Sequence, residues 1–64
     1  MLTDSREIIR RLEREGWRHV RSKGSHRQYK HPTKVGRVTV SHPNKNIPPK
    51  TVADIYRQAG WPED

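Results

Sequence analysis

The chain has 64 residues, no cysteine and a formal net charge of +7 at pH 7. This length allows a single domain over residues 1–64, and a hydrophobic content of 28% gives a core too small to enclose a substrate cavity or a cofactor-sized pocket. The lack of cysteine excludes disulfides and a thiolate zinc site, and no apolar run is long enough to predict a membrane-spanning helix.

The first predicted element is a helix over about residues 5–15. Asp4, followed three residues later by Glu7, fits an N-terminal cap with acidic groups at the positive end of the helix dipole. One face carries apolar residues at helical spacing: Ile8, Ile9 and Leu12. Gly16 suits the left-handed residue that follows a helix, so we expect the element to end there.

Three short extended segments follow, over residues 17–22, 26–31 and 37–42. The second and third each end at a His-Pro step, where the proline ring favours extended geometry in the residue before it. Residues 32–36 form a five-residue hairpin loop with the expected glycine. Residues 43–49 contain prolines and asparagines and are predicted to be a loop rather than a strand.

The last element is a helix over about residues 51–59. Its apolar residues fall at i, i+3, i+4 and i+7, and these are Val52, Ile55, Tyr56 and Ala59. Thr51 with Asp54 predicts a cap, and Gly60 a stop. The order α-β-β-β-α therefore predicts an α+β fold, in which two helices cover one face of a three-stranded antiparallel sheet and the other face meets solvent.

The charges divide the chain into a middle and two ends. No carboxylate lies between Gly16 and Ala53, so all seven acids lie near the ends. The middle holds nine of the fourteen basic residues: Arg18, Arg21, Lys23, Arg27, Lys30, Lys34, Arg37, Lys45 and Lys50. A block of one sign indicates a nucleic acid or an acidic protein partner, because a merely soluble cationic surface normally mixes both signs.

Alternation along a strand assigns residues 26–31 to two faces of the sheet. Tyr29 is the one large apolar side chain there, so its face is predicted to join the core. The side chains then expected to face solvent are His26, Gln28 and Lys30. They follow a turn at Gly24 and Ser25, where the glycine lets the backbone approach a ligand closely. Taken alone, an exposed polar histidine is ordinarily a surface residue without a function.

A second histidine, His42, opposes His26 in one of two possible registers. Pairing His31 with Arg37 brings these histidines together as an acid–base pair, but it turns the valines of the third segment to solvent. A shift of one residue returns the valines to the core and separates the histidines. We expect the second register unless a bulge intervenes.

Several other chemistries are disfavoured by the sequence. The four histidines lack nearby cysteines or carboxylates and match no metal-ligand spacing, so we predict no metal and no cofactor. No glycine-rich phosphate loop occurs. The lack of any carboxylate between Gly16 and Ala53 excludes hydrolysis by a pair of carboxylates in this part of the chain. Ser25 and His26 are adjacent and point to opposite faces, which excludes a nucleophile–base pair.

A series of short motifs runs over nearly the whole chain. They are Ser5-Arg6-Glu7-Ile8-Ile9, Leu12-Glu13, Gly16-Trp17, Lys23-Gly24-Ser25-His26, Tyr29, Arg37-Val38-Thr39-Val40, His42-Pro43, Ile47-Pro48, Thr51, Ile55 and Gln58-Ala59-Gly60. In this order they resemble HicA, the toxin of the HicA/HicB toxin–antitoxin modules of bacteria and archaea. Gly24-Ser25-His26 is the most specific part. The sequence departs from the family at Ser41, where proline is expected, and at Lys50, where glycine is common.

The resemblance implies a fold like that of double-stranded-RNA-binding domains and the activity of a ribosome-independent mRNA interferase. His26 takes the position of the family's essential histidine. As a neutral base it would remove the proton of a 2′-hydroxyl, whose oxygen attacks the adjacent phosphate without a metal and leaves a 2′,3′-cyclic phosphate. Three groups are candidates for the acid that protonates the leaving 5′-oxygen: water, Lys30 and His42.

The resemblance also implies how RNA and a protein inhibitor would bind. The candidate RNA-binding residues are Lys23, Gly24, Ser25, Arg27 and Lys30, although alternation points Arg27 toward the helices. An acidic HicB antitoxin is expected to cover the same basic block, and both proteins would be cytoplasmic. Two alternatives remain: a non-catalytic module that binds double-stranded RNA, and a structural cationic protein.

Overall fold

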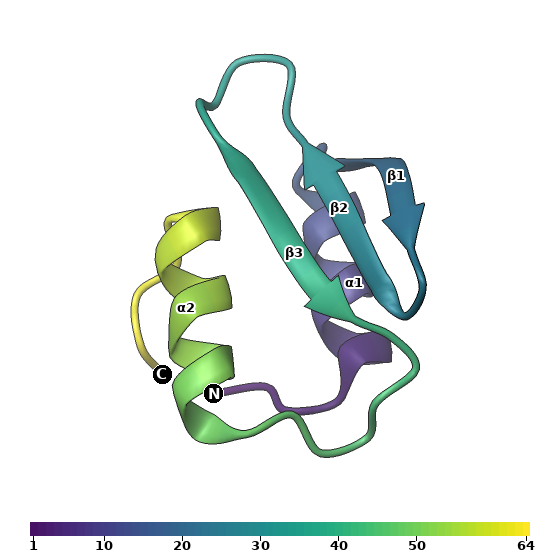
Figure 1. Ribbon diagram of the computed structural model, residues 1–64. Helices are drawn as coiled ribbons and strands as arrows, with labels where there is room; N and C mark the ends of the chain where they lie inside the picture. The colour runs from purple at the N-terminus through teal and green to yellow at the C-terminus, as the bar shows by residue number, and fades with distance from the viewer.

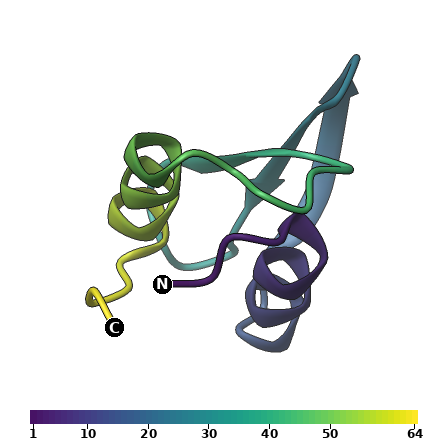
Figure 2. The ribbon, with the colours of Figure 1, turned by 90° about the horizontal axis from the view of Figure 1, so that it is seen from below.

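The computed structural model describes residues 1–64, and its elements follow the predicted order. They are α1 (Ser5–Arg14), β1 (Arg18–Lys23), β2 (His26–Lys30), β3 (Arg37–Ser41) and α2 (Pro49–Ala59). The strands form one antiparallel sheet in the order β1-β2-β3, with α1 behind it and α2 along the outer edge of β3 (Figure 1). Seen from below, α1 lies on one side of the sheet and α2 lies beside its β3 edge (Figure 2). The predicted fold class is therefore confirmed. Neither helix has the length and apolar character needed to cross a membrane.

The N-termini of the two helices differ in how they begin. Asp4 is the N-cap of α1, as predicted, and its side chain accepts a hydrogen bond from the Arg6 backbone N–H. α2 begins at Pro49, whose fixed φ suits the first turn and whose missing N–H needs no partner there. The predicted cap of Thr51 with Asp54 is wrong, because the helix starts two residues before Thr51. Both side chains are thereby free to face the sheet.

Each helix is followed by a glycine and then a tryptophan, with Gly16 after the C-cap Glu15 of α1 and Gly60 as the C-cap of α2. Gly16 and Gly60 have φ angles of +94° and +76°, which a residue with a Cβ adopts only under strain. The following backbone N–H groups, of Trp17 and Trp61, donate back into the helices, as in the Schellman motif. The turns direct both indoles into the core, where Trp17 is 1% and Trp61 7% exposed.

A polar contact ties the C-terminal ends of the two helices together. Trp61 Nε1 donates to Glu15 Oε1 at 2.7 Å, and the Arg11 guanidinium lies 4.1 Å from the Trp61 ring centroid. Burial opposes ionisation of Glu15, but the hydrogen bonds from Trp61 and Arg11 outweigh it and lower the pKa of this carboxyl. α2 is held in this way at a fixed position beside the sheet.

The register of β2 with β3 is the one that buries the valines. Tyr29 lies opposite Val38 and Arg27 opposite Val40, so Tyr29 and both valines face the helices and are fully buried. The thirteen residues of the core are Ile8, Ile9, Leu12, Trp17, Tyr29, Val38, Val40, Ile47, Val52, Ile55, Tyr56, Ala59 and Trp61. This register also pairs His26 with Ser41 rather than with His42, as expected from the patterning.

Candidate functional site

His26 is the first residue of β2 and follows the turn at Gly24 and Ser25. Gly24 has φ +58° and no atom within 4 Å of a Cβ placed on it, so the turn is open to solvent. His26 lies opposite Lys23 on β1 and Ser41 on β3. Since residues paired across antiparallel strands share a face, these three side chains form one row across the sheet.

Two further rows continue this face, which we call the open face because no helix covers it. The middle row is Arg21, Gln28 and Thr39, and the last is Arg18, Lys30 and Arg37. The open face therefore carries five cations from all three strands: Arg18, Arg21, Lys23, Lys30 and Arg37. It holds no carboxylate, so its charge suits a polyanion.

A β-bulge in β1 makes this arrangement possible. The pairing with β2 shifts between His19 and Arg21, so that Val20 has no partner of its own. Strict alternation from Arg18 would turn Arg21 and Lys23 to the covered face. Because the bulge inserts one residue, both join Arg18 on the open face. Val20 itself is 52% exposed.

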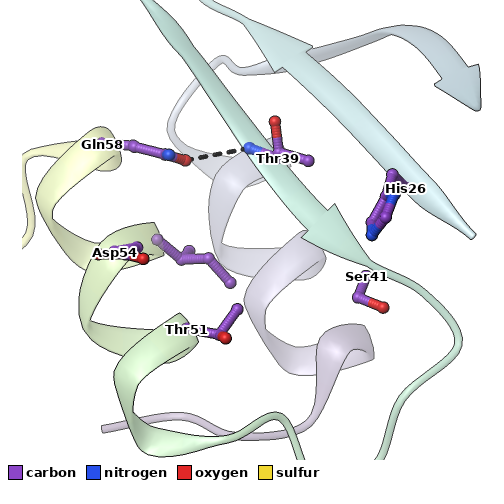
Figure 3. Close-up of a pocket in the computed structure, with 7 residues that line it drawn as sticks. His26, Thr39, Ser41, Thr51, Asp54 and Gln58 are labelled. Carbon is purple, nitrogen blue, oxygen red and sulfur yellow. Dashed lines mark hydrogen bonds between the residues drawn. The ribbon is translucent and has the colours of Figure 1, made fainter.

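The open face is not flat beside His26. Side chains from the sheet and from α2 enclose a pocket of about 200 Å³ (Figure 3). The residues that line it are His26, Thr39, Ser41, Thr51, Asp54, Ile55 and Gln58. Gln58 Oε1 accepts a hydrogen bond from the Thr39 backbone N–H at 3.1 Å. This bond satisfies a backbone group on the outer edge of β3 and connects the strand side of the pocket to the α2 side. Figure 3 shows the His26 ring at the sheet side, opposite the α2 residues.

His26 differs from the other histidines in making no hydrogen bond within the chain. His42 Nδ1 lies 2.8 Å from the hydroxyl of the buried Ser5, and that hydroxyl also accepts the Asn44 backbone N–H. His19 Nε2 lies 2.7 Å from Ser22 Oγ.

His31 bonds at both ring nitrogens. Nε2 lies 2.8 Å from the Glu15 carbonyl oxygen, and Nδ1 accepts from the backbone N–H groups of Thr33 and Lys34. Its ring packs edge-on against Trp17 at 5.3 Å between centroids. His31 therefore connects the loop over residues 32–36 to the C-terminal end of α1, and His26 is the one histidine whose side chain makes no hydrogen bond to the rest of the chain.

The residues predicted as a site fall into three positions. Lys23, His26 and Lys30 lie on the open face, and Gly24 and Ser25 form the turn beside it. Arg27 is half-buried on the covered face opposite Val40, as alternation predicts. The structure brings together no group of three or more histidine, cysteine or carboxylate side chains that could hold a metal.

Sequence reasoning missed the α2 wall of the pocket and part of the open face. Thr51, Asp54 and Gln58 recur at i, i+3 and i+7, which is one stripe of a helix, but the sequence pattern of Thr51 with Asp54 also predicts a cap. The stripe was the available signal. The positions of Arg18 and Arg21 depend on the bulge, for which the sequence carries no clear signal.

Comparison with known proteins adds one match. The model of the family described as "HicA toxin of bacterial toxin-antitoxin" matches residues 5–61 of the 64. This span runs from the start of α1 to the tryptophan after α2 and includes every residue of the open face and the pocket. A search of curated proteins found no match.

Proposed function

The chain belongs to the HicA toxin family of bacterial toxin–antitoxin modules, and from this premise we propose that it is an mRNA endoribonuclease. It would act independently of the ribosome and of metal, arrest translation and growth, and be neutralised by an acidic antitoxin of the HicB type. His26 is the proposed catalytic residue, and Lys23, Gly24, Ser25, Arg27 and Lys30 are the proposed RNA-binding residues.

The free imidazole of His26 carries this proposal. It is the one histidine without an internal hydrogen bond, and it stands in a row with Lys23 on a face that bears five cations. Phosphates bound by these cations would place the RNA backbone against the imidazole. The cations also stabilise the charge that develops on the phosphate during attack.

The reaction needs a base, an internal nucleophile and an acid. Neutral His26 takes the proton of the 2′-hydroxyl, the 2′-oxygen bonds to the adjacent phosphorus, and the bond from phosphorus to the 5′-oxygen breaks. The products are a 2′,3′-cyclic phosphate and a 5′-hydroxyl end. General base catalysis of this kind contributes about 10²–10⁴-fold to the rate.

The geometry narrows the choice of the acid. Lys30 lies four residues from His26 along β2, about 13 Å at the usual rise of a strand. His42 follows the buried Val40 by two residues, which puts it on the covered side, where it contacts Ser5. Of the three candidates, we therefore propose water as the acid that protonates the leaving 5′-oxygen.

The antitoxin would use the same charges as the RNA. An acidic surface laid over the open face meets five cations and no carboxylate, so it would compete with RNA for one surface. We propose that both proteins act in the cytoplasm, where the mRNA substrate is found. Binding between toxin and antitoxin should weaken steeply with salt, because exposed charges are screened.

The test is digestion of RNA by the purified protein in EDTA, with analysis of the product ends. We expect cyclic phosphate ends from the wild type and a loss of at least about 10²-fold in rate for His26→Ala. His19→Ala is the matched control, because it removes a histidine from the other side of the sheet. In cells, induction of the wild type should arrest growth and His26→Ala should not.

Two outcomes would contradict the mechanism: loss of cleavage on chelation, or undiminished cleavage by His26→Ala. The alternative, a non-catalytic module for double-stranded RNA, predicts stoichiometric binding of duplex RNA that is indifferent to His26 and leaves the RNA intact.

A further inference from the structure

We propose that the pocket between β3 and α2 binds one unpaired base of the RNA and that Asp54 and Gln58 make it selective for guanine. This inference rests on the proposed ribonuclease activity and names the specificity of the same site. The pocket begins at His26, so a base held there belongs to a nucleotide next to the cleaved phosphodiester bond.

The charge of the pocket separates it from the rest of the open face. Asp54 is the one ionisable side chain besides His26 that lines it, whereas the three rows of the sheet carry five cations. A carboxylate repels a phosphate but accepts hydrogen bonds from a neutral base. The backbone of the RNA is therefore expected over the rows and a base in the pocket.

The size of the pocket also fits a base. Pockets that bury whole small-molecule ligands measure roughly 300–1,000 Å³, and this one measures about 200 Å³. One planar ring system fits such a volume, and a whole nucleotide does not. Proteins that recognise single-stranded RNA commonly take unstacked bases and read their Watson–Crick edges in this way.

Two side chains one turn apart on α2 supply complementary groups. Asp54 Oδ1 accepts from Arg57 Nη2 at 2.7 Å, and its other oxygen makes no hydrogen bond within the chain. A carboxylate only accepts. Gln58 uses its carbonyl oxygen on the Thr39 backbone N–H, so its amide NH₂ group is left to donate.

Guanine matches this pair of groups. Its Watson–Crick edge has two adjacent donors, which a carboxylate can accept together. Asp54 Oδ1 can keep its contact with Arg57, because each carboxylate oxygen accepts two hydrogen bonds. Next to these donors on guanine is a carbonyl oxygen that the Gln58 amide can meet. Uracil has one N–H between two carbonyl oxygens, both of which Asp54 repels. Cytosine and adenine each offer one donating amino group to Asp54, and so one hydrogen bond fewer than guanine.

The first experiment maps the cut sites in a pool of single-stranded RNAs of random sequence. We expect the wild type to enrich guanine at one position next to the cut, and Asp54→Asn to reduce this enrichment about tenfold, since a bidentate pair discriminates between bases by about that much. Glu63→Gln is the matched control, because it removes an exposed carboxylate outside the pocket. Cleavage by the wild type without a guanine preference, or the same preference in Asp54→Asn, would overturn the inference and leave the ribonuclease activity standing.

The second experiment does not depend on cleavage. The His26→Ala protein is titrated with uncharged nucleosides while backbone amide resonances are recorded. Guanosine should shift the resonances of Thr51, Asp54 and Gln58 more than uridine does, and Asp54→Asn should remove the difference. Equal shifts with all four nucleosides, or shifts confined to other residues, would overturn the inference. An inactive wild type with a guanosine-specific shift would instead contradict the ribonuclease and support the pocket.

Discussion

The two faces of the sheet are built from the same strands and serve opposite purposes. On the covered face, Tyr29, Val38 and Val40 have no exposed surface. On the open face, their neighbours His26, Gln28 and Thr39 meet solvent or the pocket. Alternation thus separates buried from exposed side chains one residue at a time, so the same strands contribute three of the thirteen core residues and the proposed functional surface.

The largest effect is expected from a substitution on the covered face that leaves the side chains of the open face unchanged. Tyr29→Ala empties a fully buried aromatic site, which costs about 3–5 kcal/mol. A domain of this size has a free energy of unfolding of roughly 3–10 kcal/mol, so much of the variant should be unfolded at 25 °C. Gln28→Ala, the adjacent change on the open face, should cost at most about 0.5 kcal/mol. Urea unfolding followed by circular dichroism measures both.

Equal costs for the two variants would contradict this division of roles. The hydroxyl of Tyr29 does not stabilise the fold, because Tyr29 Oη is buried without a hydrogen-bond partner. Burial raises the pKa of this hydroxyl, and the nearby Arg27 guanidinium opposes the rise through its charge. The stability that is lost therefore comes from the ring.

The covered face could be predicted from the sequence, and the open face only in part. Apolar spacing in the helices and the single aromatic of residues 26–31 determine which side is buried, and the valines then select the register that separates His26 from His42. The bulge at Val20 and the α2 wall are properties of the assembled sheet. Alternation counted along one strand cannot locate an inserted residue, and a polar stripe on a helix does not tell which strand it will face.

A smaller effect is expected when cations are removed from the open face, which tests whether this face binds RNA. In a His26→Ala background, which leaves the RNA intact, replacing Arg21 and Lys23 by glutamine removes two cations from the open face. Each phosphate contact with single-stranded RNA contributes about 0.7 to the slope of log affinity against log salt. The slope should therefore fall by about 1.4, with weaker binding at low salt.

The matched control removes two cations from a helix. Arg10→Gln with Arg14→Gln lowers the net charge by the same amount, but both residues lie exposed on α1 and not on the open face. Binding of RNA, measured by fluorescence anisotropy at several salt concentrations, should keep its slope in this control. The same reduction in both double variants would mean that total charge, rather than the open face, holds the RNA.

The smallest expected effect concerns the bulge that joins β1 to the open face. Deleting Val20 leaves Arg18, His19 and Arg21 in strict alternation, so every cation stays in its row and the ladder becomes regular. Val20 is half exposed, and we expect the free energy of unfolding to change by less than about 1 kcal/mol, with RNA affinity retained. Deleting Arg27 in the central strand should instead turn half of β2 to the wrong face and unfold the domain. If the protein without Val20 folds normally but binds RNA much more weakly, the bulge does more than restore the register: the twist that it adds to an edge strand would then be what aims Arg18 and Arg21 at the RNA.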